Sequence, residues 1–310
     1  MSTRNIALFV ALVLALVAPF VAYPVFLMTA LCFALFAGAF NLLLGYAGLM
    51  SFGHAMFFGM AAYFFGHVVK AWGLPPELGL LAGVLGGAAL GLVTGALAIR
   101  RQGIYFAMIT LAFAQMIYFL CVQMPFTHGE DGLQGIPRRA LLGGLLPITN
   151  DFTLYYVVLA IFLFGYGCIY RFIHSPFGQV LKAIRENEPR AVSLGYEADR
   201  YKLLAFVLSA ALSGLAGATK AMVLQFATLT DVSAGLSGEV VLMALVGGLG
   251  TLSGPIVGAF IIITMQNYLA GFGEFVLVIQ GAIFVVIVMA FRKGLVGEIA
   301  AWWKARRPKG

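Results

Sequence analysis

Residues 25–70 read VFLMTALCFALFAGAFNLLLGYAGLMSFGHAMFFGMAAYFFGHVVK, which is two apolar runs separated by a glycine-rich stretch. The first Asp, Glu, Lys or Arg in this segment is Lys70. A helix needs about 20 apolar residues to cross the hydrocarbon core of a bilayer. The segment therefore predicts two membrane spans, at about 25–44 and 54–70. The glycines of GYAGLMSFG (45–53) predict a helix break between them.

The rest of the 310-residue chain has the same character, with 62% hydrophobic and only 10% charged residues. Soluble domains carry about 25% charged residues, and the short alternating segments of a membrane β-barrel do not occur here. The chain is predicted to be an all-α, polytopic membrane bundle with about 8–10 transmembrane segments. The remaining spans are expected at about 6–22, 78–98, 103–123, 154–173, 203–225 and 275–291. The first is read as an uncleaved span, because Pro19 and Pro24 disturb a signal-peptide cleavage site.

A second break is predicted inside the apolar segment 239–270, at GGLGTLSGP (247–255). Either two short spans or a re-entrant hairpin fits this segment. Both breaks contain the spacing G-x-x-G-x-x-S, formed by Gly45, Gly48 and Ser51 and by Gly247, Gly250 and Ser253. The match suggests an internal repeat of the kind in which broken helices line a transport path. The alternative is that unrelated glycine-rich turns look alike.

Charge predicts the topology. Lys and Arg are enriched in cytoplasmic loops, which places Arg4, the Arg100–Arg101 pair, the segment 171–202 and the tail after Arg292 in the cytoplasm. Both termini are then cytoplasmic, and the loop 124–152 is external. The net charge of +7 follows from these span ends and from the lipid-facing tail, so it does not indicate nucleic-acid binding.

The polar island, residues 171–202, is the densest cluster of charge in the chain. Ser175-Pro176 is a good helix start, and Val180, Ile184 and Asn187 are expected on one side of the helix that follows. Pro189 can interrupt or restart the helix, and Gly195 can end it. A short amphipathic helix across the cytoplasmic face suits docking into a groove on a soluble partner; a solvated loop is the simpler alternative.

Catalytic and metal-binding patterns are lacking in the sequence, so no catalytic or metal site is predicted. Acidic residues within spans, the usual mark of ion coupling, are few, and Glu274 lies near an interface. Neutral polar side chains within spans either hydrogen-bond a solute in transit or hold helices together. The candidates for the translocation path are Asn41, Thr110, Gln115, Gln225 and Glu239.

Five stretches together resemble the LivM-type permease subunits of ABC importers for branched-chain amino acids, the LivH/LivM permease family. They are NLLLGYAGLMSFGHAMFFGMAAY (41–63), RRQGIYFAMITLAFAQM (100–116), HGEDGLQGIPR (128–138), SPFGQVLKAIRENEPRAVSLGY (175–196) and VGGLGTLSGPIVGA (246–259). The resemblance covers nearly the whole chain and implies one permease domain over residues 1–310, with a cytoplasmic coupling segment at about 174–202.

In such permeases the coupling helix docks onto an ATPase. The resemblance assigns this contact to Arg185, Glu186, Asn187, Glu188, Pro189, Ala191 and Gly195. The Glu-Ala-Ala pattern of other importers is replaced here by Glu-Asn-Glu-Pro. The resemblance also implies a LivH-type second permease, two LivG/LivF-type ATPase subunits that use the ATP, and a periplasmic binding protein; the chain itself would bind no cofactor. Glu130 and Asp131 would contact the binding protein or form an outer gate.

The predicted function is the permease subunit of an ATP-driven importer of branched-chain or related hydrophobic amino acids in the bacterial inner membrane. A permease for urea or short amides, from the same family, is the nearest alternative. A secondary transporter that works alone is a further alternative, and a membrane enzyme is the third.

Overall fold

The computed structural model describes residues 13–141, 148, 150–269, 271, 275–290 and 294–298. Arg4, Glu274, Arg292 and the Trp-rich tail lie outside the described residues, as do residues 6–12 of the predicted first span. In the described part, helices account for almost all regular structure, and extended backbone pairs in an isolated bridge between Leu133 and Ala227. The predicted all-α membrane bundle is confirmed.

The helices follow the predicted spans closely. Five are long and apolar enough to cross a membrane, and α10 and α11 are shorter apolar helices. Helix α9 begins five residues before the predicted span, because its first turns carry the charges at the end of the polar island. The bounds are α2 Pro24–Asn41, α3 His54–Gly66, α4 Pro76–Ala98, α5 Ile104–Gln123, α6 Asp151–His174, α7 Pro176–Glu186, α8 Glu188–Ser193, α9 Ala198–Leu224, α10 Ala234–Gly247, α11 Gly254–Leu269 and α12 Phe275–Ala290.

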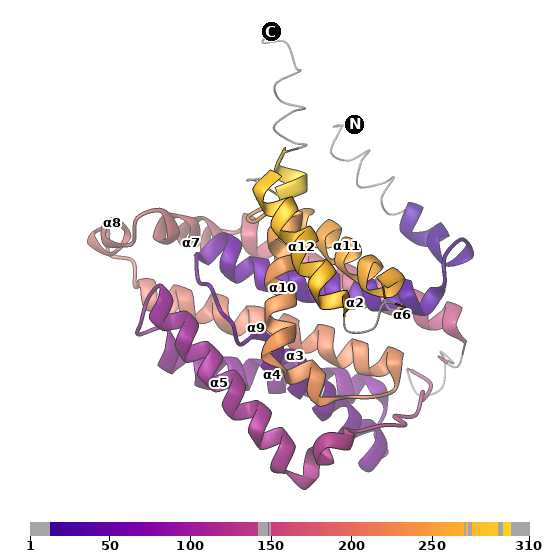
Figure 1. The fold of residues 1–310 in the computed structure, drawn as a ribbon. Helices are drawn as coiled ribbons and strands as arrows, with labels where there is room; N and C mark the ends of the chain where they lie inside the picture. The colour runs from indigo at the N-terminus through magenta and orange to yellow at the C-terminus, as the bar shows by residue number, and fades with distance from the viewer. Residues whose placement is uncertain are drawn as a thin grey trace.

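Helices α2 and α9 form the centre of the bundle (Figure 1). Within their most apolar windows, 89% of α2 and 72% of α9 is buried, against 28% of α4 and of α5. Helix α9 packs against α2, α3 and α4, and α2 also contacts α6 and α11. The outward faces of α4 and α5 carry exposed apolar side chains such as Leu85 and Phe119, a surface suited to lipid.

A stripe of glycines brings α4 close to α9. Gly79, Gly83, Gly87, Gly91 and Gly95 recur at every fourth position and are all buried. A Cβ built on Gly87 would lie 2.8 Å from the Ala210 carbonyl oxygen of α9. Small residues at this spacing let membrane helices pack through their backbones, so many glycines of this chain serve helix contact.

Both predicted breaks occur. At the first, α2 continues as a π-helical turn, η2 (Leu42–Ala47), and ends at Gly48 with φ of 73°. The chain is then non-helical through Gly53, the residue before α3. At the second, residues 248–253 separate α10 from α11, and these two helices pack against each other. Segment 239–270 is thus two short helices around a non-helical turn.

Candidate functional site

The polar island contains two short helices, α7 and α8, so the chain takes the course in which Pro189 restarts a helix. Ser175 caps α7 by accepting a hydrogen bond from the Gly178 N–H at 3.4 Å. Asn187 ends α7 with φ of −155° and caps α8 by accepting from the Arg190 N–H at 3.1 Å. Asn187 therefore lies between the helices rather than on the apolar face predicted for it. Pro189 has no N–H to donate to the Arg185 carbonyl, so α7 cannot continue through it, and the proline lies instead in the first turn of α8, where that N–H is not needed.

The island has a small hydrophobic core of its own, formed by Ile184, Ala191 and Ala198 with Val180 and Tyr201 packed against it. One residue comes from each of α7, α8 and α9, so the three segments are held as a unit. This unit projects from one end of the bundle, with α8 outermost (Figure 1).

An ion pair fastens α8 to α9. Lys202 donates to the Glu188 carboxylate at 2.5 Å, and only 4% of the lysine side chain is exposed. Glu188 and Ala191, two of the residues assigned to ATPase contact, therefore lie against the rest of the island.

Helix α8 ends in a Schellman motif centred on Gly195. The Tyr196 N–H donates to the Ala191 carbonyl at 3.2 Å, and the Gly195 N–H donates to the Val192 carbonyl at 2.9 Å. Gly195 has φ of 90°, a conformation that strains other residues. The motif leaves Val192, Leu194 and Tyr196 exposed. Val192 and Leu194 belong, with Ala191, to the short apolar face that the sequence predicts before Gly195, and they sit on the part of the chain richest in charge.

The two glycine breaks, far apart in sequence, meet in the structure. A Cβ built on Gly45 would lie 2.7 Å from the Gly250 nitrogen, so the two backbones touch. The buried side chain of Asn41 joins them by donating to the Thr251 carbonyl at 2.9 Å and accepting from the Gly250 N–H at 3.0 Å. Gly48 and Gly250, equivalent in the repeated spacing, both have φ of 73°.

Arg185 reaches this junction from α7. Its Nη1 donates to the Gly45 carbonyl, and its aliphatic stem lies against Gly48, where a Cβ would approach Cγ to 3.0 Å. The same Nη1 lies 3.8 Å from a Cβ built on Gly250. The resemblance assigns Arg185 to ATPase contact; in the structure the residue is exposed, and its guanidinium group donates to the bundle.

The path candidates do not gather at one cavity. The buried Thr110 hydroxyl accepts a hydrogen bond from the Phe52 N–H at 3.2 Å and so fixes the backbone of the first break. Asn41 does the same for the backbone of the second break. Gln225 ends α9 with φ of 63°. Gln115 and Glu239 are half-buried.

The loop that follows α5 lies at the other end of α9. Leu133 and Ala227 exchange backbone hydrogen bonds of 2.9 and 2.8 Å, and the Ile136 N–H donates to the Gln225 carbonyl at 2.9 Å. Glu130 is exposed within this loop. The loop is therefore pinned to the segment that connects α9 to α10.

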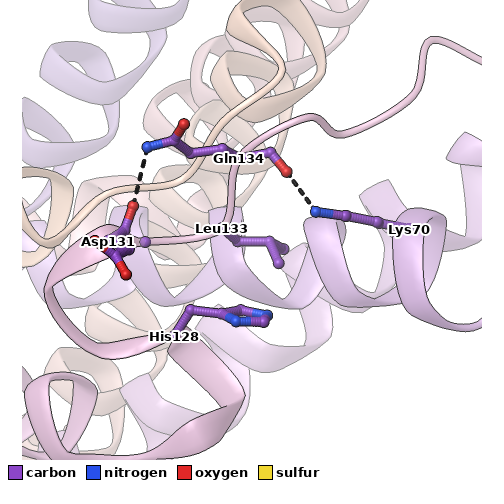
Figure 2. A pocket seen from close by; sticks show the side chains of 6 residues that line it. Lys70, His128, Asp131, Leu133 and Gln134 are labelled. Carbon is purple, nitrogen blue, oxygen red and sulfur yellow. Dashed lines mark hydrogen bonds between the residues drawn. The ribbon is translucent and has the colours of Figure 1, made fainter.

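A cavity of about 350 Å³ opens beside this loop, lined by Lys70, His128, Asp131, Gly132, Leu133 and Gln134. Figure 2 shows Lys70 donating to the Gln134 carbonyl, at 2.6 Å, and Gln134 donating to the Asp131 carbonyl, at 3.2 Å. None of the five path candidates lines it. Asp131 is thus part of an open polar recess.

One buried ion pair was missed from the sequence. Lys220 of α9 donates to both carboxylate oxygens of Asp231, at 2.8 and 2.7 Å, and the side chains are only 6% and 7% exposed. The signal was present, because Lys220 is the one charged residue inside the predicted span 203–225.

Comparison with known proteins places this arrangement in a family. The family model described as the permease component of the branched-chain amino acid transport system matches residues 23–288. The chain belongs to this family. The match includes both breaks, the polar island and the loop beside the cavity.

Individual relatives agree with the permease family. The high-affinity branched-chain amino acid transport system permease protein LivM of Escherichia coli (strain K12) is 28% identical over 282 residues, which are 82% of this chain and 65% of the relative. LivM of Salmonella typhimurium is 27% identical over 277 residues with the same coverage. The chain thus spans just under two thirds of these relatives. The L-arabinose ABC transporter permease protein AraH of Azospirillum brasilense is 29% identical over 196 residues, 61% of this chain and 56% of the relative. No solved structure matches the chain.

Proposed function

We propose that the chain is the permease subunit of an ATP-driven importer of branched-chain or related hydrophobic amino acids. The observation that carries the proposal is the family match over residues 23–288. A folded, charged unit outside the apolar helices supports it, because a permease driven by ATP needs a surface that contacts its motor. In this proposal the chain binds no cofactor, and partner subunits bind and hydrolyse the ATP.

The proposed orientation places α7, α8 and both termini in the cytoplasm of a bacterium and the cavity loop outside. It rests on the excess of Lys and Arg at the island end. Single cysteines at Glu130 and Glu186, both exposed, test it in a variant that lacks the native cysteines. A membrane-impermeant maleimide added to intact spheroplasts is expected to label position 130 and spare position 186. Labelling of both positions, or of position 186 alone, contradicts the orientation.

The ATPase contact is proposed to centre on the exposed residues Val192, Leu194 and Tyr196, with Arg190 and Glu186 beside them. Glu188, Ala191 and Asn187 would support this contact from within the island, since their side chains hold α8 in place. Leu194 is 71% exposed, and an apolar side chain that is exposed in water suits burial in the groove of a partner.

Co-purification with the ATPase subunits tests this contact. Leu194→Asp is expected to lose most of the association without preventing membrane insertion, whereas the matched control Leu194→Met keeps the apolar surface and the association. Gly195→Val is expected to weaken association as well, because a β-branched residue is strained at φ of 90°. Full association of Leu194→Asp would show that the motor contacts another surface.

The remaining partners are a LivH-type second permease and a periplasmic binding protein. The proposed contact of the binding protein is the cavity loop, where Glu130 and Asp131 present two exposed carboxylates. Replacing both by Gln and Asn is expected to slow uptake at limiting binding protein and leave ATPase association unchanged. Unchanged uptake under these conditions excludes the loop from that contact.

The substrate is tested by uptake of isotope-labelled leucine, urea and arabinose in cells with and without the chain, its ATPase and its binding protein. Saturable leucine uptake that needs ATP is the expected result. Uptake of urea alone selects the amide permease, and uptake driven by a proton or sodium gradient without ATPase subunits selects a secondary transporter. Gln115→Leu and Glu239→Leu test the two half-buried path candidates in the same assay.

A further inference from the structure

The contacts of Arg185 connect the polar island to the interior of the bundle. Gly45 lies in the last turn of the π-helical segment η2, where carbonyl groups lack a partner within the helix. Arg185 supplies that partner from α7. Arg185, a residue of the island, therefore caps the end of a membrane helix at the first break.

The first break, which Arg185 contacts, is joined directly to the second break. Gly45 and Gly250 touch through their backbones, and the Asn41 amide holds both Gly250 and Thr251. Tyr166 of α6 adds a hydrogen bond to the Leu252 carbonyl at 3.1 Å. Because every link is a backbone contact or a hydrogen bond to backbone, a shift of the Gly45 peptide displaces the turn between α10 and α11.

A second contact from α7 reinforces the first. Lys182, one turn before Arg185, lies with its ammonium group 5.6 Å from the centre of the Tyr46 ring, and cations are attracted to aromatic faces at such distances. Two side chains of α7 thus contact adjacent residues of the first break, so the helix and the break are expected to move together.

We propose that Arg185 is the positioning residue that links α7 to the junction of the two glycine breaks, so that displacement of α7 moves both breaks together. The use of this link in transport rests on the proposed function. In that function the ATPase would move the island, and Arg185 would pass the movement to the helices around the translocation path. The flexibility of Gly48 and Gly250, both at positive φ, suits a joint that changes conformation.

Hydrogen–deuterium exchange of the purified full chain tests the link without requiring transport. Arg185→Ala is expected to speed exchange of the Gly250 amide, which donates to Asn41, by about tenfold or more, since a hydrogen bond to a charged group shifts an opening equilibrium by that order. Arg185 donates to the first break only, so faster exchange at the second break reports transmission. The matched control is Arg200→Ala, which removes an exposed arginine of the island that pairs with Glu197.

Two further variants make the test decisive. Arg185→Lys retains the charge and is expected to restore part of the protection; it also serves if Arg185→Ala does not fold. Asn41→Leu removes the side-chain bridge and leaves only the backbone contact of Gly45 with Gly250, so in this background Arg185→Ala is expected to add less at the second break than it does in the wild type. Wild-type exchange at Gly250 in Arg185→Ala, or an equal rise in Arg200→Ala, overturns the proposal.

The assembled transporter gives an independent readout. Arg185→Ala is expected to keep ATPase association and hydrolysis and to lower uptake per ATP by about tenfold, with partial rescue by Arg185→Lys. Unchanged uptake per ATP in Arg185→Ala refutes the coupling role. If the wild-type chain moves no substrate, the proposed function fails, and the exchange experiment still decides whether the junction exists.

Discussion

The ion pair between Lys220 and Asp231 offers a sharp test of how this bundle is held together. Replacing Lys220 by Met removes the ammonium group and leaves the Asp231 carboxylate buried. Its remaining partners are the backbone N–H and the hydroxyl of Thr228, at 3.2 and 3.3 Å. The substitution preserves most of the volume of the side chain, so its effect reports the charge.

The magnitude follows from the geometry. Two unit charges separated by 2.7 Å attract by about 6 kcal/mol at an effective dielectric constant of about 20. Burial of each ion costs several kcal/mol, which offsets most of this attraction in the intact pair. When one partner is removed the attraction is lost and the burial cost of the other remains. Lys220→Met is therefore expected to lower the free energy of unfolding by about 3–5 kcal/mol.

Unfolding by SDS titration in mixed micelles, followed by circular dichroism, measures this difference. The double variant Lys220→Met, Asp231→Asn removes both charges and keeps an oxygen for the Thr228 N–H, so it is expected to recover most of the stability. Lys70→Met is the matched control, because Lys70 is exposed and makes one hydrogen bond to a carbonyl; its effect should stay below about 1 kcal/mol. A Lys220→Met variant as stable as wild type, or a double variant that loses the sum of the two single effects, would refute the reasoning.

Two further predictions concern packing and capping. Gly217→Ala places a Cβ 1.9 Å from the Phe58 carbonyl oxygen and must push α9 away from α3. It is expected to lower the free energy of unfolding by about 1–3 kcal/mol in the same SDS titration. Gly167→Ala is the control, because no atom lies within 4 Å of its Cβ, and it should leave the free energy of unfolding almost unchanged. Asn187→Ala removes the cap of α8 and should destabilise that helix by about 1 kcal/mol. Exchange five- to tenfold faster across residues 190–193, with α4 unchanged, is the expected result; equal rates would show that the cap contributes nothing.

The membrane architecture was readable from the sequence because hydrophobicity is a local property. Each span has to be apolar over its own length, whatever it packs against. The same holds for the start of α7 at Ser175-Pro176 and the end of α8 at Gly195, which depend on backbone preferences of the residues themselves. These features were predicted within a few residues.

Contacts across the bundle were not readable in this way. The sequence shows Arg185 as one more charge in a polar island and Lys220 as a lone charge in an apolar span. Their partners, Gly45 and Asp231, lie 140 and 11 residues away. Whether such a charge faces water, a carboxylate or a backbone carbonyl without a partner in its own helix depends on how the helices pack.

The sequence by itself determined the class of protein, its helices, its two breaks and the family that it resembles, because composition and short motifs carry that information. The tertiary structure alone decided that the two breaks touch, that Asn41 bridges them and that Arg185 joins them to the island. The physical reason is that a glycine permits a break wherever it occurs, whereas close approach of two backbones depends on how every other helix packs.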